Sequence, residues 1–152
     1  YRLETSKSSR LHFRATEVTG RPLELEQVIL NLFSNAHDAI VALRAAGGTA
    51  GRITVTVSDE QDGQSVVIQV TDDGGGIDST VLPQIFDPFF TTKEVGKGSG
   101  LGLSIGYGII DAMGGRIEAR NVDLGTGGRG VRFTVILPSQ PVSSPDREFS
   151  HA

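Results

Sequence analysis

The sequence contains no cysteine, which excludes a disulfide scaffold and any thiolate metal site. Its three histidines, His12, His37 and His151, lie too far apart in the sequence to suggest a compact zinc site. No apolar run approaches the ~20 residues needed to cross a bilayer, and residues 1–7 contain no apolar signal region. The net charge of −4 argues against a nucleic-acid-binding surface. The length of 152 residues fits one domain, which we expect to be a piece of a longer protein because the chain starts at Tyr1.

Glycine, by contrast, is abundant and unevenly distributed. The chain has 20 glycines, about twice the usual share of ~7%. Fifteen of these lie between Gly74 and Gly130, in a stretch that is also rich in isoleucine, leucine and phenylalanine. A flexible low-complexity linker would lack those large apolar side chains. The pattern therefore predicts ordered glycine-rich loops, which allow a backbone to approach a ligand closely.

Hydrophobic periodicity predicts the order of the secondary-structure elements. A half-buried strand is expected over 11–16, followed by a helix from Leu23 to about Ala46 with Pro22 in its first turn. Further on we expect a hairpin of strands over 53–58 and 65–71, a short helix near 80–86 among loops, a helix over 101–113, and strands over 116–121 and 131–137. Hairpins dominate this order, so the sheet is expected to be mixed and mostly antiparallel.

The predicted fold class is α+β. Helices with an apolar face need a sheet face to cover, so we expect a two-layer α/β sandwich with the sheet packed on about three helices. The domain is expected to span residues 11–138. Residues 1–10 are polar and are interpreted as the frayed remnant of an upstream linker. Residues 139–152 are rich in proline and serine and are interpreted as a disordered tail or linker.

A polar stripe interrupts the first predicted helix. Asn31, Asn35 and Asp38 stand at positions i, i+4 and i+7 and therefore share one helix face. Asparagine is a poor helix former, so two in a helix interior are costly unless they have a function. Amide oxygens are hard ligands that suit Mg²⁺ bound together with phosphates. The alternative is a solvent-facing stripe on an amphipathic helix.

Two glycine-rich segments have the composition of ligand-binding loops. Residues 70–77 end a strand with Asp72 and Asp73 and continue into three glycines, which would let a flat ring lie against the backbone. An ordinary acidic turn is the alternative. Residues 96–103 alternate four glycines with other residues before a helix, so free N–H groups and a positive helix end would surround an anion. The alternative there is a flexible loop with a glycine cap.

The order of these segments resembles that of the sensor histidine kinases. Residues 27–39 are similar to the N box of that family, 72–77 to its first glycine box, 85–93 to its phenylalanine box, 98–105 to its second glycine box and 133–138 to its closing strand. The resemblance covers about residues 11–138. It implies the Bergerat ATP-binding fold, shared with gyrase B subunits, mismatch-repair ATPases and a heat-shock chaperone family, and it implies ATP and Mg²⁺ as cofactors.

The resemblance also implies which residues contact the base of the nucleotide. Asp72 would accept a hydrogen bond from the adenine amino group. Gly76 and Ile77 would line the base, and Leu103 would form an apolar wall. The resemblance further places Gly74 and Thr134 in the implied ATP site.

A second implied group of residues holds the phosphates and carries out catalysis. Asn35 would coordinate Mg²⁺, Asn31 would help to hold the phosphates or their water, and Lys93 would reach the γ-phosphate. Asp38 also belongs to the implied ATP site. Many relatives carry lysine at that position, and we expect the carboxylate to organise Asn35 or a metal-bound water. The implied phosphate cradle consists of Gly98, Ser99, Gly100, Leu101 and Gly102.

The resemblance implies a mobile ATP lid over about residues 78–97. Phe86, Phe89 and Phe90 would anchor this lid or dock it on a partner, and we expect at least one of the three phenylalanines to lie in the core.

The implied function is transfer of the γ-phosphoryl group of ATP to a histidine on a separate dimerisation domain, in two-component signalling. None of the three histidines has the sequence context of a phosphoacceptor, so the acceptor is expected outside the chain. The implied partners are that histidine-containing domain and a downstream response regulator, in a homodimeric parent. We expect a cytoplasmic domain with no nucleic-acid or membrane contact, whether or not the parent is membrane-anchored.

Two other functions remain open. One is an ATP-driven switch or hydrolase of the same fold, and the other is a non-enzymatic nucleotide-binding regulator. The ATPase relatives carry a glutamate general base where Asn31 stands, and asparagine cannot take a proton from water, which disfavours hydrolysis.

Overall fold

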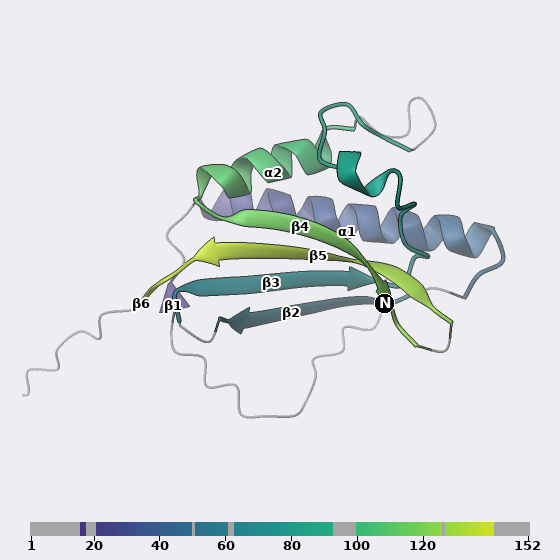
Figure 1. The fold of residues 1–152 in the computed structure, drawn as a ribbon, viewed down its shortest axis with the longest axis horizontal. Coiled ribbons are helices and arrows are strands. Elements are labelled where there is room, and N and C mark those ends of the chain that lie inside the picture. The colour runs from purple at the N-terminus through teal and green to yellow at the C-terminus, as the bar shows by residue number, and fades with distance from the viewer. Residues whose placement is uncertain are drawn as a thin grey trace, which may run out of the picture.

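Two long helices cover one face of a four-stranded sheet (Figure 1). The computed structural model describes residues 16–17, 21–49, 51–60, 63–92, 100–125 and 127–141. The elements in chain order are β1 Thr16–Glu17, α1 Pro22–Ala45, β2 Ile53–Asp59, β3 Ser65–Asp72, the 3₁₀ helix η1 Leu82–Gln84, α2 Gly102–Ala112, β4 Arg116–Asp123, β5 Arg129–Pro138 and β6 Gln140–Pro141. The helices and strands predicted between residues 22 and 138 are confirmed, each to within about two residues at either end.

The sheet has the strand order β2-β3-β5-β4, and every neighbouring pair is antiparallel. The expected antiparallel character of the sheet is therefore confirmed, and no parallel pair makes it mixed among the described strands. β3 and β4 run in the same direction because the chain crosses back through α2, but β5 lies between them. The expected third helix is only the single turn η1. Pro88 disfavours helical backbone at Asp87, which prevents η1 from growing into a longer helix.

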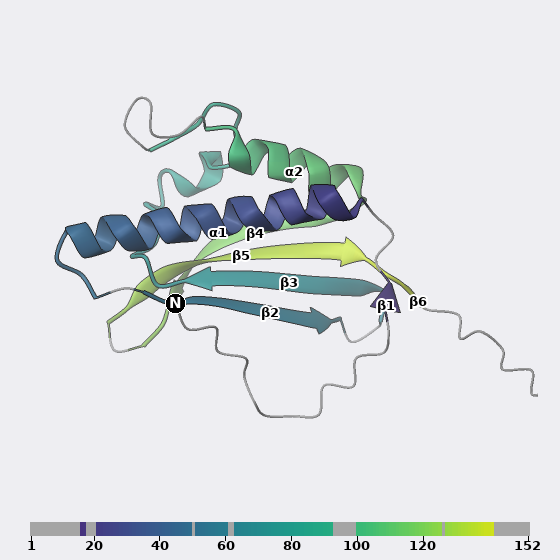
Figure 2. The same ribbon diagram turned by 180° about the vertical axis from the view of Figure 1, so that it is seen from behind.

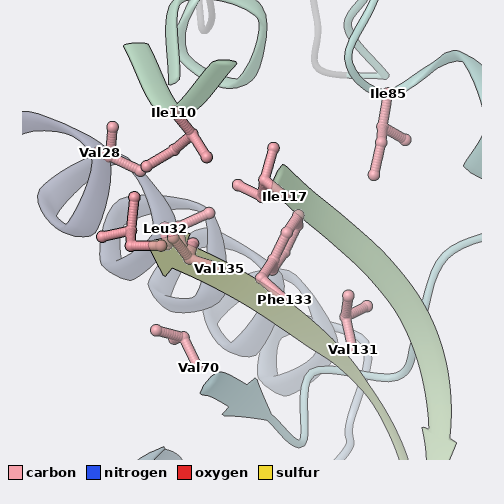
Figure 3. Close-up of a cluster of buried hydrophobic side chains, with 10 residues drawn as sticks. Val28, Leu32, Val70, Ile85, Ile110, Ile117, Val131, Phe133 and Val135 are labelled. Atoms are coloured by element: carbon pink, nitrogen blue, oxygen red, sulfur yellow. The ribbon is translucent and has the colours of Figure 1, made fainter. Parts of the chain in front are cut away.

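The core lies between the helices and the sheet. Leu32 of α1 points toward Val135 of β5, and Ile110 of α2 packs beside them (Figure 3). All three side chains are fully or almost fully buried. The two helices approach closely because Gly106 of α2 is buried next to Val28 of α1. This packing fixes the N-terminal end of α2 relative to the polar stripe of α1.

No helix of the described residues covers the other face of the sheet, here called the open face (Figures 1 and 2). Strand β5 shows the alternation that this arrangement predicts. Phe133 and Val135 are buried under the helices, whereas Arg132, Thr134 and Ile136 are partly exposed on the opposite face. The register therefore decides which side chains of β5 can take part in a site on the helical side.

The described chain continues beyond the expected domain end at residue 138. Gln140–Pro141 pairs with Thr16–Glu17 in a separate two-stranded sheet, and Ser139 donates a hydrogen bond to the Gly63 carbonyl oxygen at 2.9 Å. Of the strand predicted over 11–16, residues 11–15 lie outside the described residues, as do residues 1–10 and 142–152. Within the described part of the chain, no helix combines the length and apolar character needed to cross a membrane.

Candidate nucleotide-binding site

Asp72 ends β3 beneath the helices and is the one buried charged side chain among the described residues, with 4% of its surface exposed. Its Oδ1 accepts a hydrogen bond from the Gly74 backbone N–H at 2.8 Å. Burial raises the pKa of this carboxyl, and hydrogen bonds from the backbone of Gly74 and Val131 partly oppose that rise. A carboxylate has about four acceptor positions, so Asp72 can still accept a hydrogen bond from a ligand.

The neighbouring Asp73 has a structural role. Its Oδ1 accepts hydrogen bonds from the backbone N–H groups of Gly51 at 2.8 Å and Arg52 at 2.9 Å. These bonds tie the end of β3 to the segment that leads into β2. The two adjacent carboxylates therefore lie in different environments, because successive side chains of an extended chain point to opposite sides.

The glycine loop, defined as residues 74–77, follows these two aspartates and packs directly on α1. A Cβ atom at Gly74 would lie 2.7 Å from the Cβ of Ala39, which is closer than real side chains approach. Gly75 and Gly76 have φ values of +99° and +85°, a conformation that L side chains rarely adopt. The Gly75 N–H donates to the Arg129 carbonyl oxygen at 3.0 Å. The loop thus lies between α1 and the end of the sheet.

Asn121 of β4 holds the far end of the glycine loop, and sequence reasoning missed this residue. Its Nδ2 donates to the Ile77 carbonyl oxygen at 2.6 Å, and its Oδ1 accepts from the Ile77 N–H at 2.8 Å. Asparagine is depleted in strands, so an asparagine within a predicted strand was a usable signal.

The polar stripe of α1 faces the start of α2. Asn31 Nδ2 donates to the Gly102 carbonyl oxygen at 3.1 Å, so the solvent-facing alternative is wrong for this residue. Asn35 and Asp38 are partly buried on the same helix face. Asp38 Oδ1 lies 3.5 Å from His37 Nδ1 at the surface. The stripe therefore leads from the glycine loop side of α1 toward the N-terminus of α2.

The N-terminus of α2 has the features of an anion site. No side chain of the described residues caps this helix, and the first N–H groups and positive dipole end of a helix are features that bind anions. Gly100 has φ +65°, and a Cβ there would lie 2.6 Å from the Phe89 carbonyl carbon. Leu101 and Gly102 are partly buried, and Leu103 packs against the core. Lys93, Gly98 and Ser99, three further expected ligands, lie outside the described residues, as does the 93–97 part of the expected lid.

The three phenylalanines of the phenylalanine box have different environments. The Phe86 ring packs against Phe133 and Tyr107, with ring centroids 6.4 Å and 5.7 Å apart. Phe90 also packs against the core, which confirms that at least one of them is a core residue. Phe89 is 75% exposed and has a φ of +64°, which is unusual for a bulky residue.

Thr134 is the expected site residue that the structure does not bring to the others. It pairs with Gln69 and Glu118 on the open face of the sheet, whereas Asp72 lies on the helical side. Its neighbours Phe133 and Val135 are buried, so the alternation of strand side chains turns Thr134 away from the site. Beside Asp72 the register places Val131, whose backbone hydrogen-bonds the Asp72 carboxylate.

Comparison with known proteins identifies the family. Residues 20–141 match the family model described as histidine kinase-, DNA gyrase B- and HSP90-like ATPases. The chain belongs to this family. The catalytic domain of the histidine kinase ThkA has 35% sequence identity and a TM-score of 0.62, with 78% of this chain and 69% of that chain covered. The mycobacterial sensor histidine kinase MprB has 25% identity and a TM-score of 0.69, with 83% and 79% covered. The two-layer Bergerat fold and the resemblance to histidine kinase catalytic domains are thus confirmed.

Curated sensor kinases show the same relationship. The two-component sensor PprA of Pseudomonas aeruginosa is 42% identical over 121 residues, which cover 80% of this chain and 12% of that protein. The sensor histidine kinase ZraS of Escherichia coli O157:H7 is 42% identical over 122 residues, which cover 80% of this chain and 23% of that protein. This histidine kinase-type domain therefore spans less than a quarter of the length of these two relatives.

Proposed function

We propose that this domain binds ATP with Mg²⁺ and transfers the γ-phosphoryl group to a histidine on a separate dimerisation domain. A response regulator would then receive the signal in a two-component system. The observation that carries the proposal is the buried Asp72 carboxylate beside a glycine loop that packs on α1. The names of PprA, a two-component sensor, and ZraS, a sensor histidine kinase, support the same reaction.

Base recognition follows from the surroundings of Asp72. A buried carboxylate that already accepts backbone hydrogen bonds is stable as an acceptor for the adenine amino group. Gly76 has no side chain, so a flat ring can lie against its backbone. Leu103 would offer the base an apolar surface, since its side chain is partly buried and packs against the core.

The residues that would hold phosphates and Mg²⁺ lie along α1 and at the start of α2. The Asn35 amide oxygen is a hard, neutral ligand, and its side chain lies one turn beyond Asn31, which contacts Gly102. This donor set fits a magnesium ion that also binds phosphate oxygens. Bound Mg²⁺ would neutralise phosphate charge, and the N-terminus of α2 would do the same through its N–H groups. Lys93, Gly98 and Ser99 complete the proposed phosphate site.

The proposed reaction needs a nucleophile that this site positions in line with the γ-phosphate. A histidine ring nitrogen forms the new N–P bond, the bond between phosphorus and the β–γ bridging oxygen breaks, and ADP leaves. The proton of the attacking ring is released to solvent. Hydrolysis is disfavoured because Asn31 cannot act as a general base and its amide nitrogen is engaged by Gly102.

The test mixes radiolabelled ATP with this chain, with and without the helical dimerisation domain of the parent protein. Acid-labile label on the added domain supports the histidine kinase. Rapid phosphate release by the chain alone would support the ATP-driven hydrolase instead. Nucleotide binding with neither product would support a non-enzymatic regulator.

A further inference from the structure

Asn121, on the edge strand of the sheet, holds one end of the glycine loop through two hydrogen bonds. The donor and the acceptor of its side-chain amide both bind the backbone of the same residue, Ile77, at 2.6 Å and 2.8 Å. A Cβ at Gly76 would lie 3.0 Å from Asn121 Oδ1, so the amide lies immediately beside the loop backbone. No other side chain of the described residues contacts Ile77 through a pair of hydrogen bonds of this kind.

Asn121 and Asp72 hold opposite ends of the same loop. Asn121 pairs with Val131 in β5, and the Val131 backbone hydrogen-bonds the Asp72 carboxylate on the other side. β5 is thus the single strand between the two side chains. Asp72 fixes the loop at Gly74, and Asn121 fixes it at Ile77.

We infer that Asn121 is a positioning residue of the adenine pocket, which sets the spacing between the glycine loop and the Asp72 carboxylate. Gly75 and Gly76 populate many backbone conformations at little cost, so their own sterics do not keep the loop in one shape. The double hydrogen bond to Ile77 supplies that restraint before the base arrives. This inference rests on the proposed function, because adenine is the proposed ligand of the pocket.

Two substitutions separate positioning from simple stability. Asn121→Ala removes both hydrogen bonds, whereas Asn121→Asp keeps the shape and the acceptor but turns an oxygen toward the Ile77 carbonyl oxygen. Gln69→Ala and Gln69→Glu are matched controls, because they make the same chemical changes on the open face of the sheet. Dissociation constants for adenosine, ADP and Mg²⁺–ATP are measured by calorimetry below the melting temperature of every variant. The ¹⁵N amide signal of Ile77 is recorded without nucleotide.

We expect both Asn121 variants to weaken all three ligands by the same factor, about tenfold, which corresponds to the loss of one or two backbone hydrogen bonds. The gain in ATP affinity on adding Mg²⁺ should be unchanged, because the phosphate site is untouched. The Ile77 amide signal should shift in both Asn121 variants and in neither Gln69 variant.

An adenosine affinity that stays at the wild-type value in Asn121→Asp would overturn the inference, even if the melting temperature falls. An Ile77 signal that does not move in either Asn121 variant would also overturn it. The proposed function fails separately: wild-type protein that binds neither adenosine nor ATP overturns that function and this inference together. Wild-type binding with unaffected variants overturns the inference alone.

Discussion

At the residue scale, two chemically identical neighbours at the end of β3 lie in different environments. Asp72 is buried on the helical side, and Asp73 accepts backbone hydrogen bonds from Gly51 and Arg52 near the surface. A buried carboxylate lowers the stability of the fold unless it is hydrogen-bonded. The pKa of Asp72 is raised because its backbone hydrogen bonds offset only part of the effect of burial. Such a residue is expected to serve binding rather than folding.

The first prediction concerns base selectivity. Asp72→Ala should weaken ATP binding by roughly 1.5–3 kcal/mol, the scale of a hydrogen bond to a charged group. Wild-type protein should prefer ATP to GTP, because guanine presents a carbonyl oxygen where adenine presents an amino group. Calorimetry measures both affinities. Asp73→Asn is the control, which should lower the melting temperature but not reverse the preference. Equal affinities for ATP and GTP in the wild-type protein would contradict the assignment of Asp72.

The second prediction concerns pH. Because burial raises the pKa of Asp72, its carboxyl binds a proton more tightly in the folded protein than in the unfolded chain. Its contribution to stability is therefore complete below the ordinary aspartate pKa and is lost as pH rises through the raised value. Asp72→Asn removes this titration. As pH rises through this range, the free energy of unfolding of Asp72→Asn should increase relative to that of the wild-type protein. Urea unfolding measures this difference. Parallel pH profiles would contradict the prediction.

The third prediction concerns the metal. Asn35→Ala should weaken binding of Mg²⁺–ATP but leave binding of metal-free adenosine unchanged, because only the phosphate end of the site loses a ligand. Titration of each ligand with and without Mg²⁺ measures the two effects separately. An equal loss for both ligands would show that Asn35 supports the fold of α1 instead.

At the element scale, glycines allow close contacts that assemble the site. Gly74 lets the glycine loop touch α1 at Ala39, and Gly130 lets β5 approach the end of β3. A Cβ at Gly130 would overlap the Asp72 carbonyl oxygen. Gly108 of α2, in contrast, has nothing within 4 Å of a Cβ and no positive φ. The abundance of glycine therefore has a local cause at some positions and none at others.

The fourth prediction follows from this difference. Gly130→Ala should lower the free energy of unfolding by about 1–3 kcal/mol, because backbone must move at the strand end. It should also weaken nucleotide binding, since the displaced atoms belong to Asp72. Gly108→Ala is the matched control and should raise stability by up to about 1 kcal/mol through helix propensity. Urea unfolding measures both. A neutral Gly130→Ala would show that the two strands can separate there without cost.

At the scale of the whole molecule, the fold gathers the site from segments that are distant in sequence. The crossover from β3 through η1 and α2 to β4 places the start of α2 against Asn31 and the edge strand against the glycine loop. Base, phosphates and metal would thus contact separate parts of the chain. In this proposal the described residues supply much of the binding surface, and the acceptor histidine would lie on another domain.

The fifth prediction concerns the chain by itself. It should bind ATP but neither label itself nor hydrolyse ATP quickly, because a general base is absent at Asn31 and such a base contributes about 10²–10⁴-fold to catalysis. Addition of the parent's dimerisation domain should restore phosphotransfer. Phosphate release and acid-labile labelling report the two reactions. Stable label on His37 would contradict the view that the acceptor lies outside this chain.

The sequence by itself determined the elements and the family. Apolar residues at helical or alternating spacing fix local structure, since each element must bury one face, and α1, α2 and β2 to β5 accordingly lie where periodicity placed them. Asp72 and the first glycine box were chosen in advance because the order of the segments resembles that of the sensor histidine kinases. Taken alone, a strand-end carboxylate followed by glycines also fits an ordinary acidic turn.

Tertiary structure decided what depends on register and on contacts between distant segments. It placed Thr134 on the open face, since successive side chains of a strand point to opposite faces of the sheet. It placed Asp72 and Asp73 in different environments, and it paired Asn121 with Ile77 across 44 positions of sequence. It also inserted β5 between β3 and β4, so that the sheet is antiparallel where a mixed one was expected. Such pairings depend on how whole elements pack, because no local pattern specifies which strand lies beside which.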